Sequence, residues 1–464
     1  MIQLDKIKRV WFIGIGGIGM SALARYFHLL QLPVEGYDRT PSSVTDALQK
    51  EGIRVVFSDE PEMISASFTD SEDTLVVYTP AVSDTQRQLL YFQEKGFSVK
   101  KRSEVLGMIT NGSKAICIAG THGKTTISTL TAHLFTKSSL GCNAFLGGIS
   151  KNYQTNFLWN EHSPFVVLEA DEYDRSFLQL TPSTALISAV DADHLDIYGD
   201  HAHVIEAFRE FAQRIPAGGN LLIKKGIEVN WELKDSVKVF TYSSTDDADF
   251  YATDLLLKDG LYEFTLVTPE EEIKGFSLGI PGLLNVENAV GACALALLNG
   301  ATASELISAL SQFKGIARRF DKQIETPELV YIDDYAHHPA EIEATLKSVR
   351  AIYPNHFLVG AFQPHLYTRT RDFAQEFGES LSLLDELYLL DIYPARELPI
   401  EGIDSTSIGK FVKDIKVYYC SKEEVMDKIK LHPSMIFITM GAGDIDRVVP
   451  KITERLKELA KPKQ

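Results

Sequence analysis

The sequence predicts an α/β protein of three domains, each built on a mainly parallel sheet with flanking helices. Short apolar runs alternate with segments of helical period along the chain, and this alternation is typical of βαβ units. The pattern restarts twice, near the Asn111-Gly112 turn and after Gly315. The chain has 464 residues, and at about 150 residues per domain this length also suggests three domains. We expect them at 1–109, 110–315 and 316–464.

The first domain is expected to be Rossmann-like. A strand at 10–13, a glycine-rich turn at 14–19 and a helix that ends near Gln31 open it. Further strands are expected at 33–38 and 74–79.

The second domain is expected to be of the P-loop ATPase type. Its pattern begins with a strand, a glycine-bearing loop and a helix, and it ends in a β-rich stretch that we expect to be antiparallel, followed by one more helix. In chain order, the expected elements are a strand at 115–119, a loop at 120–124, a helix at 125–135, strands at 165–169 and 184–190, antiparallel strands between 237 and 280, and a helix at 286–298.

The third domain alternates strands and helices once more, and it is also expected to be Rossmann-like. The expected elements are strands at 329–334, 357–362, 387–392 and 435–440, and helices at 339–352, near 370–384 and near 444–460.

The charge balance excludes several kinds of partner. Lysine and arginine number 46 against 63 aspartates and glutamates, which gives a formal net charge of −17. Such an acidic chain is a poor candidate for binding nucleic acid or an anionic membrane surface. A small phosphate ligand needs only one or two local cations, so small-molecule partners fit the composition.

The cysteines and the apolar runs indicate a cytoplasmic protein. The four cysteines are far apart and form no C-x-x-C pair, which argues against a disulfide framework or a zinc ribbon and fits a reducing compartment. Glycines interrupt the apolar run near the N-terminus, so we expect no signal peptide. The run at 289–298 is about half the length that spans a bilayer. We expect a monomer or a weak homodimer.

A glycine-rich motif lies between the first expected strand and helix. It has the form G-x-G-x-x-G, and Asp38 ends the next strand, 19 residues after the last glycine. Glycines let the backbone approach a diphosphate at a helix N-terminus, and the acidic residue would accept a hydrogen bond from a ribose hydroxyl. The motif alone does not distinguish NAD from a UDP-sugar. Its glycine positions are Gly14, Gly16, Gly17 and Gly19.

A second phosphate-binding motif lies between the strand and the helix that open the second domain. It is a shortened P-loop, G-x-x-G-K-T-T, because the strict form needs a glycine at the position of Ile118. Backbone N–H groups of such a loop cradle phosphates, Lys124 would contact the β- and γ-oxygens, and Thr125 would ligate Mg²⁺. The motif consists of Gly120, Thr121, His122, Gly123, Lys124, Thr125 and Thr126.

Two acidic clusters follow expected strands of the same domain. One contains Glu169, Asp171 and Glu172, and the other is Asp191-Ala-Asp-His194-Leu-Asp. Carboxylates with a histidine near a nucleotide loop suit a Mg²⁺ ion that bridges phosphates. Either cluster alone would more often be a solvated strand end, and the neighbouring phosphate loop favours the metal site.

Several motifs, in this order along the whole chain, resemble the Mur ligases of peptidoglycan synthesis. They read GTHGKTT, EADE, DADHLD, LLNVENAVGACALAL, ARRF and DDYAHHPAE. Within the family, GIGGIGMSALA, DDYAHHPAEI and QPHLYTRTRDF are similar to the branch that adds L-alanine. The resemblance implies that the first domain binds the UDP-sugar, the second binds ATP and the third binds the amino acid.

The resemblance also implies roles for single residues. The first glycine loop and Asp38 would hold the UDP moiety, whereas Glu169 and His194 would bind magnesium. Nearer the nucleotide, Asn285 and Asn288 would lie by the adenine, although both could instead cap a helix, and Arg319 and Asp334 would reach the nucleotide from the third domain. The residues that would face the muramoyl carboxylate and the amino acid are His337, His338, His365 and Arg369.

One feature departs from the wider family. Several Mur ligases use a carbamylated lysine shortly after the D-H-x-D motif, and no lysine occurs here from Leu195 to Ile223. The alanine-adding branch also lacks this lysine. The ligands of a second Mg²⁺ ion are therefore left open.

The expected activity is ATP-dependent amide formation between the lactyl carboxylate of UDP-N-acetylmuramate and L-alanine. Transfer of the γ-phosphoryl group would convert the carboxylate into an acyl phosphate, which the amine then attacks. Lys124, Mg²⁺ and Arg319 would stabilise the phosphoryl charge, and His337 or His338 would orient or deprotonate the incoming ammonium group.

Three alternative functions would use some of the same motifs. A murein peptide ligase would attach a ready-made tripeptide to the same sugar nucleotide. A nicotinamide-dependent oxidoreductase would use the first glycine loop, but the second phosphate loop argues against it. A regulator that binds nucleotide without catalysis would keep the motifs without releasing phosphate.

Overall fold

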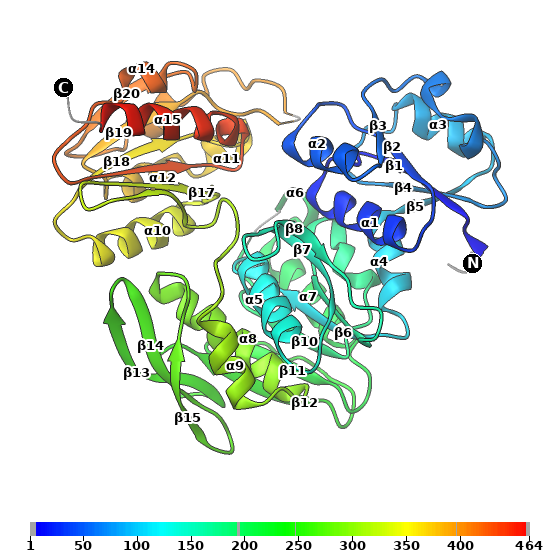
Figure 1. Cartoon of the computed structure of the whole chain (residues 1–464). Helices are drawn as coiled ribbons and strands as arrows, with labels where there is room; N and C mark the ends of the chain where they lie inside the picture. The colour runs from blue at the N-terminus through cyan, green and yellow to red at the C-terminus, as the bar shows by residue number, and fades with distance from the viewer. Residues whose placement is uncertain (1–5, 193–194, 246, 396, 461–464) are drawn as a thin grey trace. The chain divides into compact units, whose positions relative to one another are not determined.

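Figure 1 shows the computed structural model, which describes residues 6–192, 195–245, 247–395 and 397–460. Three sheets follow one another along the chain, and helices lie between their strands. The predicted α/β class with mainly parallel sheets is confirmed. No helix in the described part of the chain is both long and apolar enough to cross a membrane.

The first sheet has five strands in the order β3-β2-β1-β4-β5, and every neighbouring pair is parallel. The apolar run of β1 is buried at its centre because helices cover both faces of a parallel sheet. The strands are β1 (Arg9–Ile13), β2 (Val34–Tyr37), β3 (Arg54–Val56), β4 (Thr74–Tyr78) and β5 (Ser98–Lys101). The helices are α1 (Ile18–Leu29), α2 (Ser43–Lys50), η2 (Pro61–Met63), η3 (Ala66–Phe68), α3 (Arg87–Glu94) and α4 (Arg102–Thr110).

The second sheet has ten strands in the order β15-β14-β13-β12-β11-β10-β6-β9-β7-β8. Its strands are β6 (Lys114–Ala119), β7 (Asn143–Ser150), β8 (Thr155–Leu158), β9 (Phe165–Glu169), β10 (Thr184–Ile187), β11 (Asn220–Lys224), β12 (Lys238–Ser243), β13 (Phe250–Lys258), β14 (Leu261–Val267) and β15 (Glu272–Ser277). The helices of this region are α5 (Lys124–Lys137), η4 (Tyr173–Gln179), α6 (Leu195–Tyr198), α7 (His201–Ala212), α8 (Leu283–Leu298) and α9 (Ala303–Leu310).

One expectation for this sheet is wrong in part. The stretch between 237 and 280 was expected to be antiparallel throughout, yet β12 pairs in parallel with both β11 and β13. Residues 225–237 connect the end of β11 to the start of β12, which lies at the opposite end of the strands. The two strands therefore run in the same direction, and β12 extends the parallel sheet. The β14–β15 pair is antiparallel, as predicted.

The third sheet has six strands in the order β16-β17-β21-β18-β19-β20, and only its edge pair β16–β17 is antiparallel. The strands are β16 (Asp321–Glu325), β17 (Leu329–Asp334), β18 (Phe357–Phe362), β19 (Glu386–Leu390), β20 (Lys416–Cys420) and β21 (Met435–Met440). The helices are α10 (Pro339–Ile352), α11 (Tyr367–Asp372), α12 (Ala374–Leu381), α13 (Thr406–Gly409), α14 (Val425–Lys428), η5 (Asp444–Val448) and α15 (Val449–Leu459).

Contacts divide the chain into two compact units. One consists of Met1–Leu256, Glu263–Gly279 and Val286–Lys314, and the other of Leu257–Tyr262, Ile280–Asn285 and Gly315–Gln464. The first two sheets therefore belong to one unit, apart from residues 257–262, which include the end of β13 and the start of β14. One apolar core of this unit includes both Val10 of β1 and Phe211 of α7. The boundary at 109 between the first two expected domains stays a prediction.

The two sheets of the first unit meet along helix α1. Tyr26 of α1 packs against Phe145 of β7 and Phe157 of β8, with ring centroids 5.6 and 6.0 Å apart. Beside this contact, the buried Arg25 guanidinium donates two hydrogen bonds of 2.8 Å to Glu51 and a third to the Asn156 side chain of β8. A charged group buried in this way needs such partners.

Loss of the Asn156 amide should weaken this junction. Its nitrogen donates to the Ile18 carbonyl and to the Ser21 hydroxyl, and the side chain is fully buried. Asn156→Ala would leave buried polar groups unsatisfied, which costs about 1–3 kcal/mol for each group. We expect a clearly lower thermal unfolding midpoint for Asn156→Ala and an unchanged midpoint for Gln49→Ala, which removes an exposed amide of α2. Equal midpoints for the two variants would contradict the role of Asn156.

The third sheet contains a buried carboxyl group that should make stability depend on pH. The Asp333 carboxylate accepts a 2.7 Å hydrogen bond from Thr439 Oγ1 and lies 3.7 Å from Arg318 Nε. Burial raises the pKa of Asp333 from 3.8 to about 6, even though Arg318 acts in the opposite direction. Between these pH values the folded chain holds more protons at this site than the unfolded chain, so the site destabilises the fold as the pH rises.

Asp333→Asn should remove this dependence. The difference between the two urea-unfolding midpoints, variant minus wild type, should increase as the pH rises from about 4 to about 6 and then level off, because only the wild type loses stability over this range. Far-UV circular dichroism at a series of pH values would measure both midpoints. A difference that stays constant over this range would show that Asp333 has an ordinary pKa.

Candidate active site

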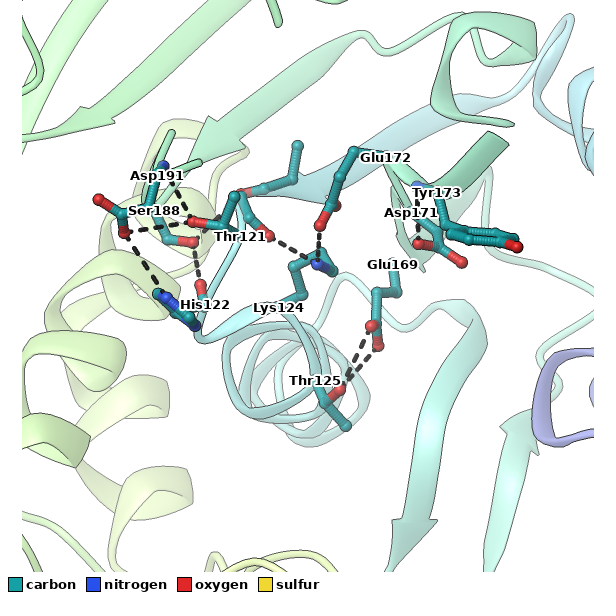
Figure 2. Close-up of polar contacts among 12 residues, drawn as sticks. Thr121, His122, Lys124, Thr125, Glu169, Asp171, Glu172, Tyr173, Ser188 and Asp191 are labelled. Atoms are coloured by element: carbon teal, nitrogen blue, oxygen red, sulfur yellow. Dashed lines mark hydrogen bonds and ion pairs between the residues drawn. The ribbon is translucent and has the colours of Figure 1, made fainter. Parts of the chain in front are cut away.

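The phosphate loop predicted at 120–126 connects β6 to α5, as expected from the sequence (Figure 2). Gly120 and Gly123 have positive φ angles of +137° and +82°. A Cβ atom on Gly120 would lie 2.2 Å from Ser188 Oγ and 2.8 Å from Ala189 N. The loop therefore needs glycine both for its backbone conformation and for its close packing on the carboxyl end of β10.

Lys124 is held in place by two oxygen atoms. Its ammonium group donates a 2.7 Å hydrogen bond to the Gly120 carbonyl and forms a 2.8 Å ion pair with Glu172 Oε1 (Figure 2). The Glu172 side chain is only 1% exposed. Burial alone would lower the pKa of Lys124, but the carboxylates of Glu172, Asp171 and Glu169 outweigh it and raise the pKa. Lys124 is therefore positively charged at the base of the phosphate loop.

Two of the three predicted metal ligands meet at the first turn of α5. Thr125 Oγ1 lies 3.0 and 3.3 Å from the two carboxylate oxygens of Glu169, which ends β9 (Figure 2). A Cβ atom on Gly147 of β7 would lie 1.9 Å from Glu169 Oε2, so that glycine makes room for the carboxylate. The third predicted ligand, His194, lies outside the described residues.

The remaining carboxylates near this loop have other partners. Asp191 Oδ2 accepts a 3.3 Å hydrogen bond from Thr121 Oγ1 and lies 3.6 Å from His122 Nε2 (Figure 2). Asp171 Oδ2 lies 3.3 Å from Arg102 Nη2.

No group of three histidines, cysteines, aspartates or glutamates arranged to hold a metal occurs among the residues that the structure describes. Thr126 is half-buried in the first turn of α5.

The two asparagines predicted to lie by the adenine have different surroundings. Both belong to α8, but Asn285 falls in the second unit and Asn288 in the first. A Cβ atom on Gly123 would lie 3.2 Å from Asn288 Oδ1, so Asn288 borders the phosphate loop. Asn285 Nδ2 donates a 2.6 Å hydrogen bond to the Pro281 carbonyl, just before the helix begins. The adenine contact stays a prediction for both.

The first glycine loop lies where the sequence placed it, between β1 and α1. Asp38 Oδ2 accepts a 2.8 Å hydrogen bond from the backbone N–H of Gly16, and a Cβ atom on Gly16 would lie 2.8 Å from the same oxygen. Gly14 has a φ of +86°, and Gly17 is the N-cap of α1. The structure thus brings Asp38 to the loop, and its predicted contact with the UDP moiety stays a prediction.

In the second unit, Arg319 and Asp334 lie near each other. Asp334 accepts hydrogen bonds of 2.7 Å from Phe320 N and 2.8 Å from Ala336 N. Burial raises the pKa of Asp334, and the positive charge of Arg319 opposes this shift. The Arg319 guanidinium lies 5.0 Å from the centre of the Tyr335 ring, a cation–π contact.

The histidines of the same unit divide into two groups. His337 Nδ1 lies 3.0 Å from the Tyr335 carbonyl and 3.2 Å from Glu341 Oε2, and its ring meets the edge of the His365 ring at 6.2 Å. His338 instead packs on Phe373, with ring centroids 5.1 Å apart. The structure therefore brings His337 and His365 together and places His338 in a different contact. Arg369 is half-buried in α11, beyond His365.

Sequence reasoning missed three residues of the site. Glu172 was named only as part of an acidic cluster, and neither its ion pair with Lys124 nor the roles of Arg102 and Gly147 were predicted. No local pattern marks these residues. Their contacts depend on which strands are neighbours in the second sheet and on how α4 packs.

Comparisons with known proteins agree along the whole chain. Three family models match in order: the Mur ligase family catalytic domain over residues 9–114, the Mur ligase middle domain over 118–296, and the Mur ligase glutamate ligase domain over 318–443. The UDP-N-acetylmuramate–L-alanine ligase of Porphyromonas gingivalis strain W83 is 51% identical to this chain over 456 residues, which cover 98% of the chain and 100% of the relative.

Two solved structures have similar folds over nearly the full length. The crystal structure of the UDP-N-acetylmuramate–alanine ligase MurC from Thermotoga maritima is 25% identical, with a TM-score of 0.82, and the alignment covers 97% of this chain and 99% of that one. The murein peptide ligase from Psychrobacter arcticus is 19% identical, with a TM-score of 0.69 and coverage of 98% and 100%, and this likeness concerns the fold alone. The motifs, the three sheets and these matches lead to one conclusion, which confirms the resemblance seen in the sequence: the chain belongs to the Mur ligase family.

Proposed function

We propose that this chain joins L-alanine to the lactyl carboxylate of UDP-N-acetylmuramate in an ATP-dependent reaction of peptidoglycan precursor synthesis. The observation that carries the proposal is its 51% identity, over 98% of the chain, to a relative named for that activity. The likeness to a murein peptide ligase is lower in both identity and TM-score than the likeness to the alanine ligase. The alternative of tripeptide transfer is therefore less well supported.

ATP is the proposed nucleotide of the 120–126 loop. Its backbone N–H groups would cradle the phosphates, and the Lys124 ammonium, already charged and fixed by Glu172, would contact the β- and γ-oxygens. Asn288 beside Gly123 supports placing the adenosine part at this end of α8. Arg319 and Asp334 are proposed to contact the nucleotide, and Asn285 to contact the adenine.

Mg²⁺ is the proposed metal, and the donor set fits it. The Thr125 hydroxyl and the Glu169 carboxylate are hard oxygen donors that face each other at 3.0 Å beside the phosphate loop. Thr125, Glu169 and His194 are the proposed ligands. A bound Mg²⁺ ion would reduce the negative charge of the phosphate oxygens.

The two substrates are assigned to the other two sheets. The glycine loop and Asp38 are proposed to hold the UDP moiety, because the Asp38 carboxylate lies against the Gly16 backbone within this loop. The amino acid and the muramoyl carboxylate are proposed to contact His337, His338, His365 and Arg369. The close approach of the His337 and His365 rings supports a shared role for these two residues.

The chemistry follows from the poor reactivity of a carboxylate. A carboxylate oxygen of the substrate attacks the γ-phosphorus of ATP, and ADP leaves. The L-alanine amine then attacks the carbonyl carbon of the acyl phosphate, and the tetrahedral intermediate collapses to amide and phosphate. Lys124 and Arg319 stabilise the charge that spreads over the transferred phosphoryl oxygens, and His337 orients or deprotonates the ammonium group of alanine.

A cytoplasmic location and a monomeric or weakly dimeric state are further parts of the proposal. The four cysteines are buried thiols in the structure, which fits a reducing compartment. The substrates are small molecules, and the net charge of −17 is unfavourable for nucleic-acid binding.

Phosphate release measures the proposed reaction directly. The purified chain should release phosphate only when ATP, UDP-N-acetylmuramate and L-alanine are all present, and the product should be UDP-N-acetylmuramoyl-L-alanine by mass spectrometry. A preference for the tripeptide over L-alanine would identify a murein peptide ligase instead. Binding of NAD without phosphate release would support an oxidoreductase.

Removal of the Lys124 ammonium group should nearly abolish turnover. Lys124→Ala should lower kcat by about 10³-fold or more, because the charge is needed where the transition state develops negative charge. Lys137→Ala is the matched control, since Lys137 is an exposed lysine at the other end of the same helix. A Lys124→Ala variant with more than about a tenth of wild-type turnover would rule out this role.

A side chain at position 147 should disturb the metal site without removing a ligand. The Cβ atom of Gly147→Ala would overlap the Glu169 carboxylate and displace it from Thr125. The Mg²⁺ concentration for half-maximal rate should rise by about 10-fold or more, whereas Ile149→Val on the same strand should leave it unchanged. The same Mg²⁺ requirement in both variants would count against Glu169 as a ligand.

A further inference from the structure

Arg102 lies between the two phosphate sites of the first unit. A Cβ atom on Gly19, in the first turn of α1, would lie 2.2 Å from Arg102 Nη1 and 3.1 Å from its Cζ atom. The other terminal nitrogen, Nη2, lies 3.3 Å from Asp171 Oδ2, two residues after Glu169. One guanidinium group thus contacts the glycine loop and the acidic segment that borders the ATP loop.

The neighbouring basic residues do not share this position. Lys100 pairs with Glu104 at 2.9 Å, and Lys101 pairs with Asp174 at 2.8 Å. The Arg102 side chain is 22% exposed, so it is partly open to solvent. A guanidinium has five N–H donors in a fixed plane and can bind an anion while it remains paired with a carboxylate.

The acidic segment that Arg102 contacts carries three carboxylates with three different partners. Glu169 accepts from the Thr125 hydroxyl, Asp171 pairs with Arg102, and Glu172 pairs with Lys124. Because these residues lie within one stretch of four residues, a constraint on Asp171 also constrains Glu169 and Glu172. Asp171 further accepts a 3.2 Å hydrogen bond from the Tyr173 N–H, which ties its carboxylate to the start of η4.

We propose that Arg102 is a positioning residue that couples the UDP-sugar site to the ATP site. The diphosphate at the glycine loop accepts hydrogen bonds from the edge of the guanidinium next to Gly19, and the ordered guanidinium holds Asp171, and with it Glu169 and Glu172, in place. This proposal rests on the proposed function. It implies positive coupling, and since coupling is reciprocal, each ligand tightens binding of the other by the same factor.

Isothermal titration measures this coupling without turnover. Binding of UDP-N-acetylmuramate would be measured with and without saturating Mg²⁺ and a non-hydrolysable ATP analogue. In the wild type we expect the analogue to tighten UDP-N-acetylmuramate binding by about 5-fold or more. Arg102→Gln should weaken the UDP-sugar and abolish the coupling, whereas Asp171→Asn should abolish the coupling while changing the affinity of the UDP-sugar alone by less than about 3-fold.

The double variant and a matched control complete the test. Arg102→Gln combined with Asp171→Asn should lose no more coupling than either single variant, because both act through one ion pair. Lys101→Gln, which removes the adjacent ion pair with Asp174, should retain the wild-type coupling. Far-UV circular dichroism and the thermal unfolding midpoint of each variant would show that it folds, and Arg102→Lys would replace Arg102→Gln if that variant does not fold.

The titration and the product assay together distinguish a failure of the role of Arg102 from a failure of the proposed function. A wild type that binds UDP-N-acetylmuramate and makes the product, but shows no coupling or keeps it in Arg102→Gln, would overturn the role of Arg102 alone. A wild type that does not bind UDP-N-acetylmuramate would overturn both proposals.

Discussion

The ion pair between Lys124 and Glu172 is the interaction on which the phosphate loop, the proposed ATP site, depends. A carboxylate that is 1% exposed needs a cation nearby, and an ammonium group at the base of a phosphate loop needs a fixed position. The ion pair compensates the charge of the buried Glu172 carboxylate and fixes the position of the Lys124 ammonium group. The same ammonium group donates a hydrogen bond to the Gly120 carbonyl. Because Glu172 lies three residues after Glu169, the same pair fixes the backbone segment that presents the Glu169 carboxylate to Thr125.

This arrangement explains the positions of the glycines around the site. Gly120 allows the loop to approach Ser188 and Ala189 at the end of β10, and Gly147 leaves space for the Glu169 carboxylate. Gly19 leaves space for the Arg102 guanidinium in the same way. In each case the missing Cβ atom accommodates a charged or polar group of another element, so these glycines are needed for tertiary contacts as much as for turns.

The sequence predicted the parts of the site that depend on local structure. The strand, glycine loop and helix at 115–135, the approach of Asp38 to the first glycine loop, and the three-sheet α/β fold all follow from periodicity and motif spacing, and the family follows from motif order. The ion pair of Glu172, the position of Arg102 and the parallel pairing of β12 depend on the strand order and on α4, which no local pattern encodes. The separation of His338 from His337 and His365 has the same cause, because adjacent residues at the start of α10 point toward different neighbours.

In the proposed reaction, the γ-phosphoryl group of ATP at the phosphate loop passes to a substrate carboxylate, and the L-alanine amine then attacks the resulting acyl phosphate. Oxygen-isotope transfer tests it most directly, with UDP-N-acetylmuramate labelled with ¹⁸O at both carboxylate oxygens. An acyl phosphate predicts that one labelled atom is found in inorganic phosphate and one in the new amide, measured by mass spectrometry after a single turnover. Label in AMP, or phosphate without label, would contradict this account.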